Sequence, residues 1–130
     1  MKIVVLGGLG YQGKAAVIDL LRSPEVTAVV CADARLDGLE SFAALEGCAK
    51  LRPVPVDAAD AQGADAAIDL LPIRFMPAAF EAAIAARVPL VSTNYAHGLG
   101  HLDAPARRQG VTLMPECGLD PGIDLVIIGN

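Results

Sequence analysis

The chain of 130 residues is 54% hydrophobic and 19% charged, with 10 basic and 15 acidic side chains and a formal net charge of −5. This length and apolarity suffice for one hydrophobic core, which excludes an intrinsically disordered chain. The acidic balance and an aromatic content of 4% argue against a nucleic-acid-binding protein. Phosphate backbones need a basic face, and single strands also need stacking aromatics.

Cysteine content and apolar runs indicate a compartment. Cys31, Cys48 and Cys117 make an odd number and form no Cys-x-x-Cys pair, a pattern that favours reduced thiols. No apolar run reaches the roughly 18 residues that a membrane-spanning helix needs. The apolar run of residues 3–6 is too short for a signal peptide. We therefore expect a cytoplasmic protein without a membrane segment.

Segments typical of strands and helices alternate along the chain. Residues 3–6 are typical of a strand buried on both faces, and a helix is expected from residue 13 to the Ser23-Pro24 pair. Further strands are expected at residues 26–32, 51–56, 66–71, 90–93 and 111–114, and further helices at residues 39–45, 77–85 and 101–109. The alternation predicts an α/β fold: one domain, residues 1–130, built on a doubly wound, mostly parallel six-stranded Rossmann sheet.

Two prolines, Pro53 and Pro55, lie in the third expected strand. Proline has no backbone N–H to donate to a neighbouring strand, so this strand belongs at an edge of the sheet. The doubly wound strand order 3-2-1-4-5-6 places the third strand at an edge. We therefore expect that order.

The last segment is unusually apolar. Asp120-Pro121 is typical of a helix N-cap followed by proline in the first turn, and an apolar run over residues 123–128 follows, with the chain ending at Asn130. A helix that is apolar nearly all round is normally covered. We expect the chain to be the N-terminal part of a longer protein, or a partner to cover this segment. The alternative is a short terminal helix lying on the chain's own sheet.

Residues 8–13 read G-x-G-x-x-G between the first expected strand and the first helix. In that context one glycine permits a tight turn, another lets the backbone approach a pyrophosphate, and the third lets the helix pack on the strand. The helix N-terminus adds unpaired N–H groups and a positive dipole end. The residues predicted to cradle the pyrophosphate of a dinucleotide are Gly8, Gly10, Tyr11, Gln12 and Gly13.

An acidic residue, Asp33, ends the second expected strand, twenty residues after Gly13. A carboxylate in that position can accept both hydroxyls of an adenosine ribose. The guanidinium of Arg35 could hold the 2′-phosphate of NADP, but the carboxylate would repel that phosphate. We expect Asp33 and Arg35 to bind the adenosine ribose of NAD or NADP, with NAD favoured.

Two other kinds of site were weighed against this one. Residues 8–14 also match G-x-x-x-x-G-K, but Ala15 lacks the hydroxyl with which a P-loop holds magnesium. His97 and His101 lie four residues apart with only Asp103 as a nearby further ligand. The sequence therefore argues against an ATP site of the P-loop type and predicts no metal site.

A second motif occupies residues 115–124, Pro-Glu-Cys-Gly-Leu-Asp-Pro-Gly-Ile-Asp. It resembles the GLDPGID element of the saccharopine dehydrogenase family, which includes saccharopine reductases and lysine 6-dehydrogenases. Residues 70–72 and 91–95 resemble the ends of that family's fourth and fifth strands, so the resemblance covers essentially the whole chain. The residues that it implies to border the nicotinamide ribose and ring are Leu71, Pro72, Thr93 and Asn94.

The resemblance implies hydride transfer at a carbon–nitrogen bond of an amino acid, in which an amine is oxidised to an imine or an imine is reduced. Asp120 is the candidate catalytic residue, a polar group facing an amino-acid-type substrate. Family members carry a substrate-binding and dimerising domain after this segment, so a homodimer is expected, and little activity is expected of this chain alone. The alternative is a stand-alone nicotinamide-nucleotide-binding module, sensory or regulatory, or an inactive fragment.

Overall fold

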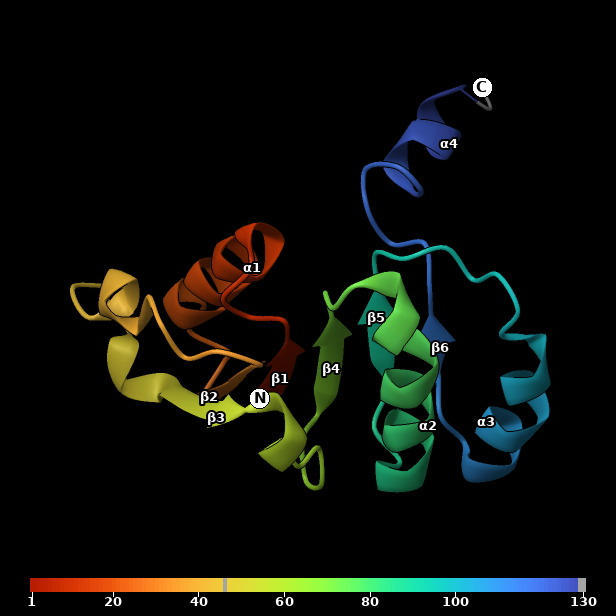
Figure 1. Cartoon of the computed structure of the whole chain (residues 1–130), viewed down its shortest axis with the longest axis horizontal. Helices are drawn as coiled ribbons and strands as arrows, with labels where there is room; N and C mark the ends of the chain where they lie inside the picture. The colour runs from red at the N-terminus through yellow and green to blue at the C-terminus, as the bar shows by residue number, and fades with distance from the viewer. Residues whose placement is uncertain (46, 129–130) are drawn as a thin grey trace.

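The computed structural model describes residues 1–45 and 47–128, so the expected helix end at Asn130 lies outside the described residues. Within the described residues one sheet of six strands has the order β3-β2-β1-β4-β5-β6, which confirms the expected order (Figure 1). Every strand pair is parallel. The strands are β1 (Lys2–Leu6), β2 (Ala28–Asp33), β3 (Leu51–Pro55), β4 (Ala66–Asp69), β5 (Leu90–Ser92) and β6 (Leu113–Met114).

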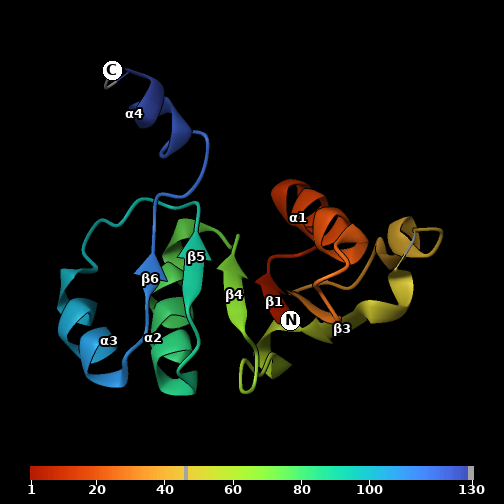
Figure 2. The ribbon, with the colours of Figure 1, turned by 180° about the vertical axis from the view of Figure 1, so that it is seen from behind.

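Helices cover both faces of the sheet. α1 (Tyr11–Arg22) contributes Val17 to a buried cluster that contains Val5 of β1. α2 (Met76–Ala86) and α3 (Asp103–Gln109) contribute to a second cluster, which contains Val4 of the same strand. Neighbouring residues on a strand point to opposite faces, so the two clusters lie on opposite sides of the sheet. α2 stands in front of the sheet in Figure 1 and behind it in Figure 2.

The strand register brings the carboxyl ends of four strands to one edge. Leu6, which ends β1, pairs with Ala32 of β2 and with Asp69, which ends β4. Asp69 in turn pairs with Ser92 at the end of β5. Ligands of open parallel sheets bind at this edge. The turns that follow these strands are therefore placed to build one site.

The helix expected over residues 39–45 is wrong. Two short 3-10 helices, η1 (Leu39–Phe42) and η2 (Cys48–Lys50), follow Gly38 and Gly47, whose φ angles are +91° and +82°. Glycines in the left-handed conformation interrupt a helix, and the few residues between them are too few for a stable α-helix. The remaining 3-10 helices of the described residues are η3 (Val56–Ala58), η4 (Ile73–Phe75) and η5 (Gly100–Leu102).

The C-terminal helix begins later than the Asp120-Pro121 pattern predicts. α4 spans Ile123–Ile128, because Gly122 has a φ of +145°, which is incompatible with helix. Asp120 is therefore not the cap of α4. Figures 1 and 2 show α4 beyond the carboxyl end of β6 and away from the sheet, so it is not a helix lying on its own sheet. No helix among the described residues combines the length and apolarity needed to cross a membrane.

Candidate dinucleotide site

The turn between β1 and α1 is held by backbone hydrogen bonds. Gly7 has a φ of +77°, and the N–H groups of Gly7 and Gly8 donate to the Ala32 carbonyl at 2.8 and 3.2 Å. The N–H of Gly10, the N-cap of α1, donates to the Gly7 carbonyl at 3.1 Å. The turn thus ends on the N-terminus of a helix of 12 residues, whose dipole and unpaired N–H groups favour an anion.

The glycines of this turn have different steric surroundings. A Cβ atom on Gly13 would lie 2.0 Å from the Gly7 carbonyl oxygen, and one on Gly8 would lie 2.6 Å from the Sγ of Cys31. These two glycines serve close packing beneath the turn. A Cβ atom on Gly10 would meet only the Gly7 oxygen among the described residues, at 3.4 Å. Gly10 therefore faces the open space in which a phosphate can approach.

A cavity of about 840 Å³ opens beside the turn. Its walls come from the turns that follow β1, β2 and β4, with one residue from η3. The lining residues are Gly7, Leu9 and Gly10, then Asp33, Ala34, Arg35 and Asp37, then Leu70, Leu71, Pro72, Arg74 and Phe75, with Val56. The cavity thus joins the glycine motif to the acidic end of β2, the pairing that the sequence predicts.

Asp33 points partly into the protein. Its Oδ2 accepts the N–H of Leu9 at 2.9 Å, and its Oδ1 accepts the N–H of Arg35 at 3.5 Å. The carboxylate therefore braces the glycine turn, a role that sequence reasoning missed. The exposed guanidinium of Arg35 pairs with Asp37, with Nε 2.9 Å from Oδ2.

A second guanidinium reaches the cavity from the turn after β4. Arg74 and Phe75 both line the cavity, and the Cζ of Arg74 lies 4.6 Å from the centroid of the Phe75 ring. A cation and an aromatic face side by side suit a planar base and a phosphate. Sequence reasoning missed both residues, although an Arg-Phe pair soon after the fourth strand was an available signal.

The predicted site residues divide into two groups. Tyr11 is fully exposed on α1, and the Oγ1 of Thr93 donates to the Oε1 of Gln12 at 3.4 Å. The Nδ2 of Asn94 donates to the Leu71 carbonyl at 2.9 Å. These contacts tie α1, β4 and β5 together at the edge next to the cavity. The predicted residues that line the cavity itself are Gly10, Asp33, Arg35, Leu71 and Pro72.

A buried polar pair lies behind these turns. Asp69 and Ser92 are each 0% exposed, and the Ser92 hydroxyl donates to Asp69 Oδ2 at 2.9 Å. Desolvation raises the pKa of the Asp69 carboxyl, although hydrogen bonds to it act in the opposite direction. Sequence reasoning missed this pair; an aspartate inside an otherwise apolar strand was the available signal.

Asp120 is held by the loop after β5. The Tyr95 hydroxyl donates to Asp120 Oδ1 at 2.7 Å, and this bond is the main cause that raises the Tyr95 pKa. The Tyr95 ring stacks on that of His97 with centroids 5.6 Å apart. The N–H of Ala96 donates to Glu116 Oε1 at 3.0 Å, which joins the same loop to the segment after β6. Among the described residues no group of three or more His, Cys, Asp or Glu side chains could hold a metal ion.

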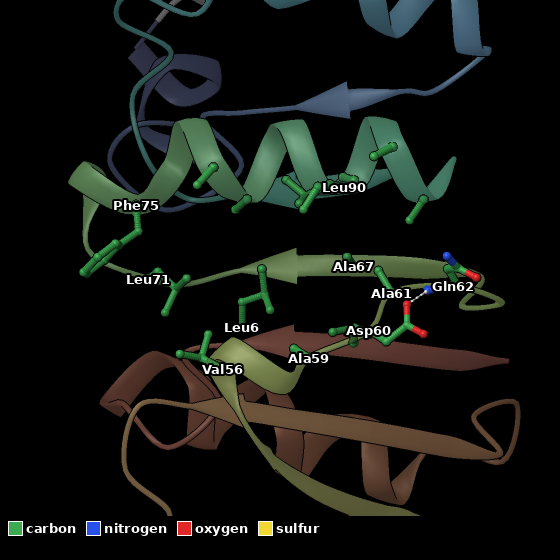
Figure 3. A pocket seen from close by; sticks show the side chains of 17 residues that line it. Leu6, Val56, Ala59, Asp60, Ala61, Gln62, Ala67, Leu71, Phe75 and Leu90 are labelled. Atoms are coloured by element: carbon green, nitrogen blue, oxygen red, sulfur yellow. Dashed lines mark hydrogen bonds between the residues drawn. The ribbon is translucent and has the colours of Figure 1, made fainter.

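A second cavity, of about 450 Å³, lies on the face of the sheet that α2 covers. Figure 3 shows α2 on one side of it and the connection from β3 to β4 on the other, with Leu6 and Ala67 on the strands between them. A short 3-10 helix in that connection leaves the alanines of α2 beside open space. Val56, Leu71 and Phe75 line both cavities, so the two are continuous at this rim.

A parallel sheet in this order, with a glycine turn leading from its first strand to the first helix, defines the class of dinucleotide-binding Rossmann domains. The sequence model of one family within this class, described as the saccharopine dehydrogenase NADP binding domain, matches residues 3–114. The chain belongs to this family.

Relatives of known identity agree with this assignment. Saccharopine dehydrogenases (NADP⁺, L-glutamate-forming) from Saccharomyces cerevisiae and Pyricularia oryzae are each 30% identical over 131 residues, 95% of this chain and 28% of the relative. The chain thus spans less than a third of their length. The apo L-Glu-forming enzyme of S. cerevisiae matches with a TM-score of 0.80 at 25% identity, over 98% of this chain and 29% of that one. A putative myo-inositol dehydrogenase from Sinorhizobium meliloti shares the fold, with a TM-score of 0.70 at 20% identity over 88% of this chain and 35% of that one.

The preference for NAD over NADP is wrong. The matched family and both curated relatives are named for NADP. The sequence argument treated Asp33 as a free ribose ligand that repels a 2′-phosphate. In the structure one of its oxygens is engaged by the Leu9 N–H, and Arg74 adds a second positive charge to the cavity.

Proposed function

We propose that this chain binds NADP(H) for an oxidoreductase that transfers a hydride at the CH–NH bond of an amino acid. The observation that carries the proposal is the cavity of about 840 Å³ between the glycine turn, the end of β2 and the turn after β4. Membership of the family supports the choice of cofactor, and the names of the curated relatives support the class of substrate.

The glycine turn receives the pyrophosphate. Gly10 leaves room for it, and Gly8 and Gly13 allow the close packing on which the shape of the turn depends. Tyr11 and Gln12 lie in the first turn of α1, where backbone N–H groups have no partner within the helix and can donate to phosphate oxygens.

Two arginines provide for the 2′-phosphate. Arg35 and Arg74 reach the cavity from the turns after β2 and β4, and guanidinium groups bind phosphate through paired hydrogen bonds. Phe75 offers a ring face to the adenine. Asp33 keeps lone pairs for a ribose hydroxyl beyond those used by the Leu9 N–H.

The nicotinamide half lies towards β5. Leu71 and Pro72 form the near wall, and Thr93 and Asn94 follow at the next strand end. When bound, NADP supplies the nicotinamide carbon that accepts or donates the hydride. Asp120, held by the Tyr95 hydroxyl, is a carboxylate able to bind the amino group of an amino-acid-type substrate.

Calorimetric titration with NADPH, NADH and magnesium-ATP tests the cofactor. We expect NADPH to bind more tightly than NADH, independently of magnesium. Arg74→Ala should weaken NADPH about tenfold or more, since a hydrogen bond to a charged group contributes about 1.5–3 kcal/mol, and should leave NADH nearly unchanged. The matched control is Arg108→Ala, an exposed arginine on α3. Equal affinity of the wild type for the two dinucleotides would contradict the proposal.

The assembly around this domain is part of the same proposal. Ile123, Ile127 and Ile128 are 58%, 68% and 79% exposed on α4, which supports further protein contacts of this segment, in a longer chain or in a homodimer. The cytoplasmic location and the separate substrate domain remain predictions from the sequence.

A further inference from the structure

A charged group of the core is unusual in its surroundings. Asp69 ends β4 with its side chain 0% exposed, and neither ion pair found among the described residues includes it. Burial of a carboxylate costs free energy unless hydrogen bonds compensate it. An apolar residue at this position would avoid that cost, so the carboxylate calls for a role beyond packing.

Hydrogen bonds around Asp69 form a closed ring. Its Oδ1 accepts the N–H of Leu71 at 3.1 Å, and its Oδ2 accepts the Ser92 hydroxyl at 2.9 Å. The Ser92 Oγ accepts the N–H of Asn94 at 3.2 Å, and the Asn94 Nδ2 donates to the Leu71 carbonyl at 2.9 Å. Both lone-pair sides of the carboxylate are thus used, one for each of two turns.

The two turns joined by the ring are those assigned above to the nicotinamide half. Leu71 lines the cavity, and its backbone is held from both sides, through its N–H by Asp69 and through its carbonyl by Asn94. The ring lies behind the glycine turn only through β1, whose Leu6 pairs with Asp69. The pyrophosphate and adenosine contacts arise from β1 and β2 and do not depend on the ring.

We propose that Asp69 is a positioning residue that sets the spacing of the turns after β4 and β5 for the nicotinamide half of the cofactor. This inference rests on the proposed function. Asp69 does not touch the cofactor, because its side chain is fully buried. It acts through the backbone of Leu71 and, by way of Ser92, through Asn94.

Two ligands separate this role from a general effect on the fold. NADPH carries both halves of the cofactor, whereas adenosine 2′,5′-bisphosphate carries the adenosine half alone. Asp69→Asn, which keeps size but removes charge and one acceptor, should weaken NADPH about tenfold while adenosine 2′,5′-bisphosphate changes less than about twofold. The fluorescence of bound NADPH, which reports the nicotinamide surroundings, should shift as well. The matched control is Asp65→Asn, an exposed aspartate before β4 that accepts the N–H of Lys2 at 2.6 Å.

A second variant keeps the test decisive. Ser92→Ala breaks the same ring from β5, should show the same selectivity for NADPH, and decides the question if Asp69→Asn does not fold by circular dichroism. The double variant should weaken NADPH less than the product of the single effects, since both break one ring. If both ligands weaken equally, or neither changes, the positioning role is wrong while the proposed function stands. If the wild type binds neither ligand, the proposed function itself fails and this inference fails with it.

Discussion

One missing Cβ atom serves two different purposes in the glycine turn. At Gly13 the side-chain position is filled by the carbonyl oxygen of Gly7, 2.0 Å from where a Cβ atom would lie. At Gly10 the corresponding space is open, and the residue has a φ of −67°, which any residue can adopt. Gly13 is therefore required by packing of α1, whereas Gly10 is required only if a ligand occupies the space beside it.

Substitution of these two glycines should separate stability from binding. Gly13→Ala should lower the free energy of unfolding by about 1–3 kcal/mol, because overpacking forces α1 from the turn. Gly10→Val should keep the far-UV circular dichroism spectrum and abolish NADPH binding, because the branched side chain fills the phosphate space. Urea unfolding and calorimetry measure the two effects. Retained NADPH affinity in Gly10→Val would show that the phosphate does not approach this residue.

At the scale of the element, α2 and α3 end in the same way with different residues. The C-cap of α2 is Arg87, with a φ of +58°, and the C-cap of α3 is Gly110, with a φ of +67°. The left-handed conformation is strained for a residue with a Cβ atom and unstrained for glycine. Glycine is therefore present at one of two equivalent positions and absent from the other.

Exchange of residue type at these caps should act in opposite directions. Arg87→Gly should raise the free energy of unfolding by about 0.5–1 kcal/mol, since the strain outweighs the exposed bond from Arg87 Nε to Gln109 Oε1. Gly110→Ala should lower it by about 1 kcal/mol, although a Cβ atom there has no neighbour within 4 Å among the described residues. Urea unfolding of both variants tests this pair, and shifts of the same sign would contradict the conformational explanation.

At the scale of the whole molecule, the buried carboxyl of Asp69 links stability to pH. Desolvation raises its pKa above the ordinary aspartate value in the folded protein, whereas the unfolded chain titrates at the ordinary value. A raised native pKa adds stability that is fully present below the unfolded pKa and is lost as pH rises through the native pKa. The sign is therefore opposite to that of a carboxylate in an ion pair.

Comparison of the wild type with Asp69→Asn should isolate this dependence. The free energy of unfolding of the wild type minus that of the variant should fall as pH rises from the ordinary aspartate pKa to the higher native pKa, and should be constant above it. Other titrating groups cancel in the difference because they are present in both proteins. A series of urea titrations from acid to neutral pH measures it, and a difference that rises with pH would mean that hydrogen bonds, not burial, dominate the Asp69 carboxyl.

Local patterns allowed most of the fold to be predicted. The apolar runs, the prolines of β3 and the glycine motif act over a few residues, and each led to the correct element or the correct place in the sheet. The helix over residues 39–45 failed because Gly38 and Gly47 interrupt it. The helix start at Asp120 failed because Gly122 follows it too closely.

The sequence by itself determined the α/β class, the strand order, the glycine turn and the family, because the residues that encode them are neighbours along the chain. Only the tertiary structure decided the partners of the three aspartates. Asp33 and Leu9 are 24 residues apart, Asp69 and Ser92 are 23 apart, and Asp120 and Tyr95 are 25 apart. Each pair belongs to the ends of different strands, so its contact exists only once the register of the parallel sheet has brought those ends to one edge.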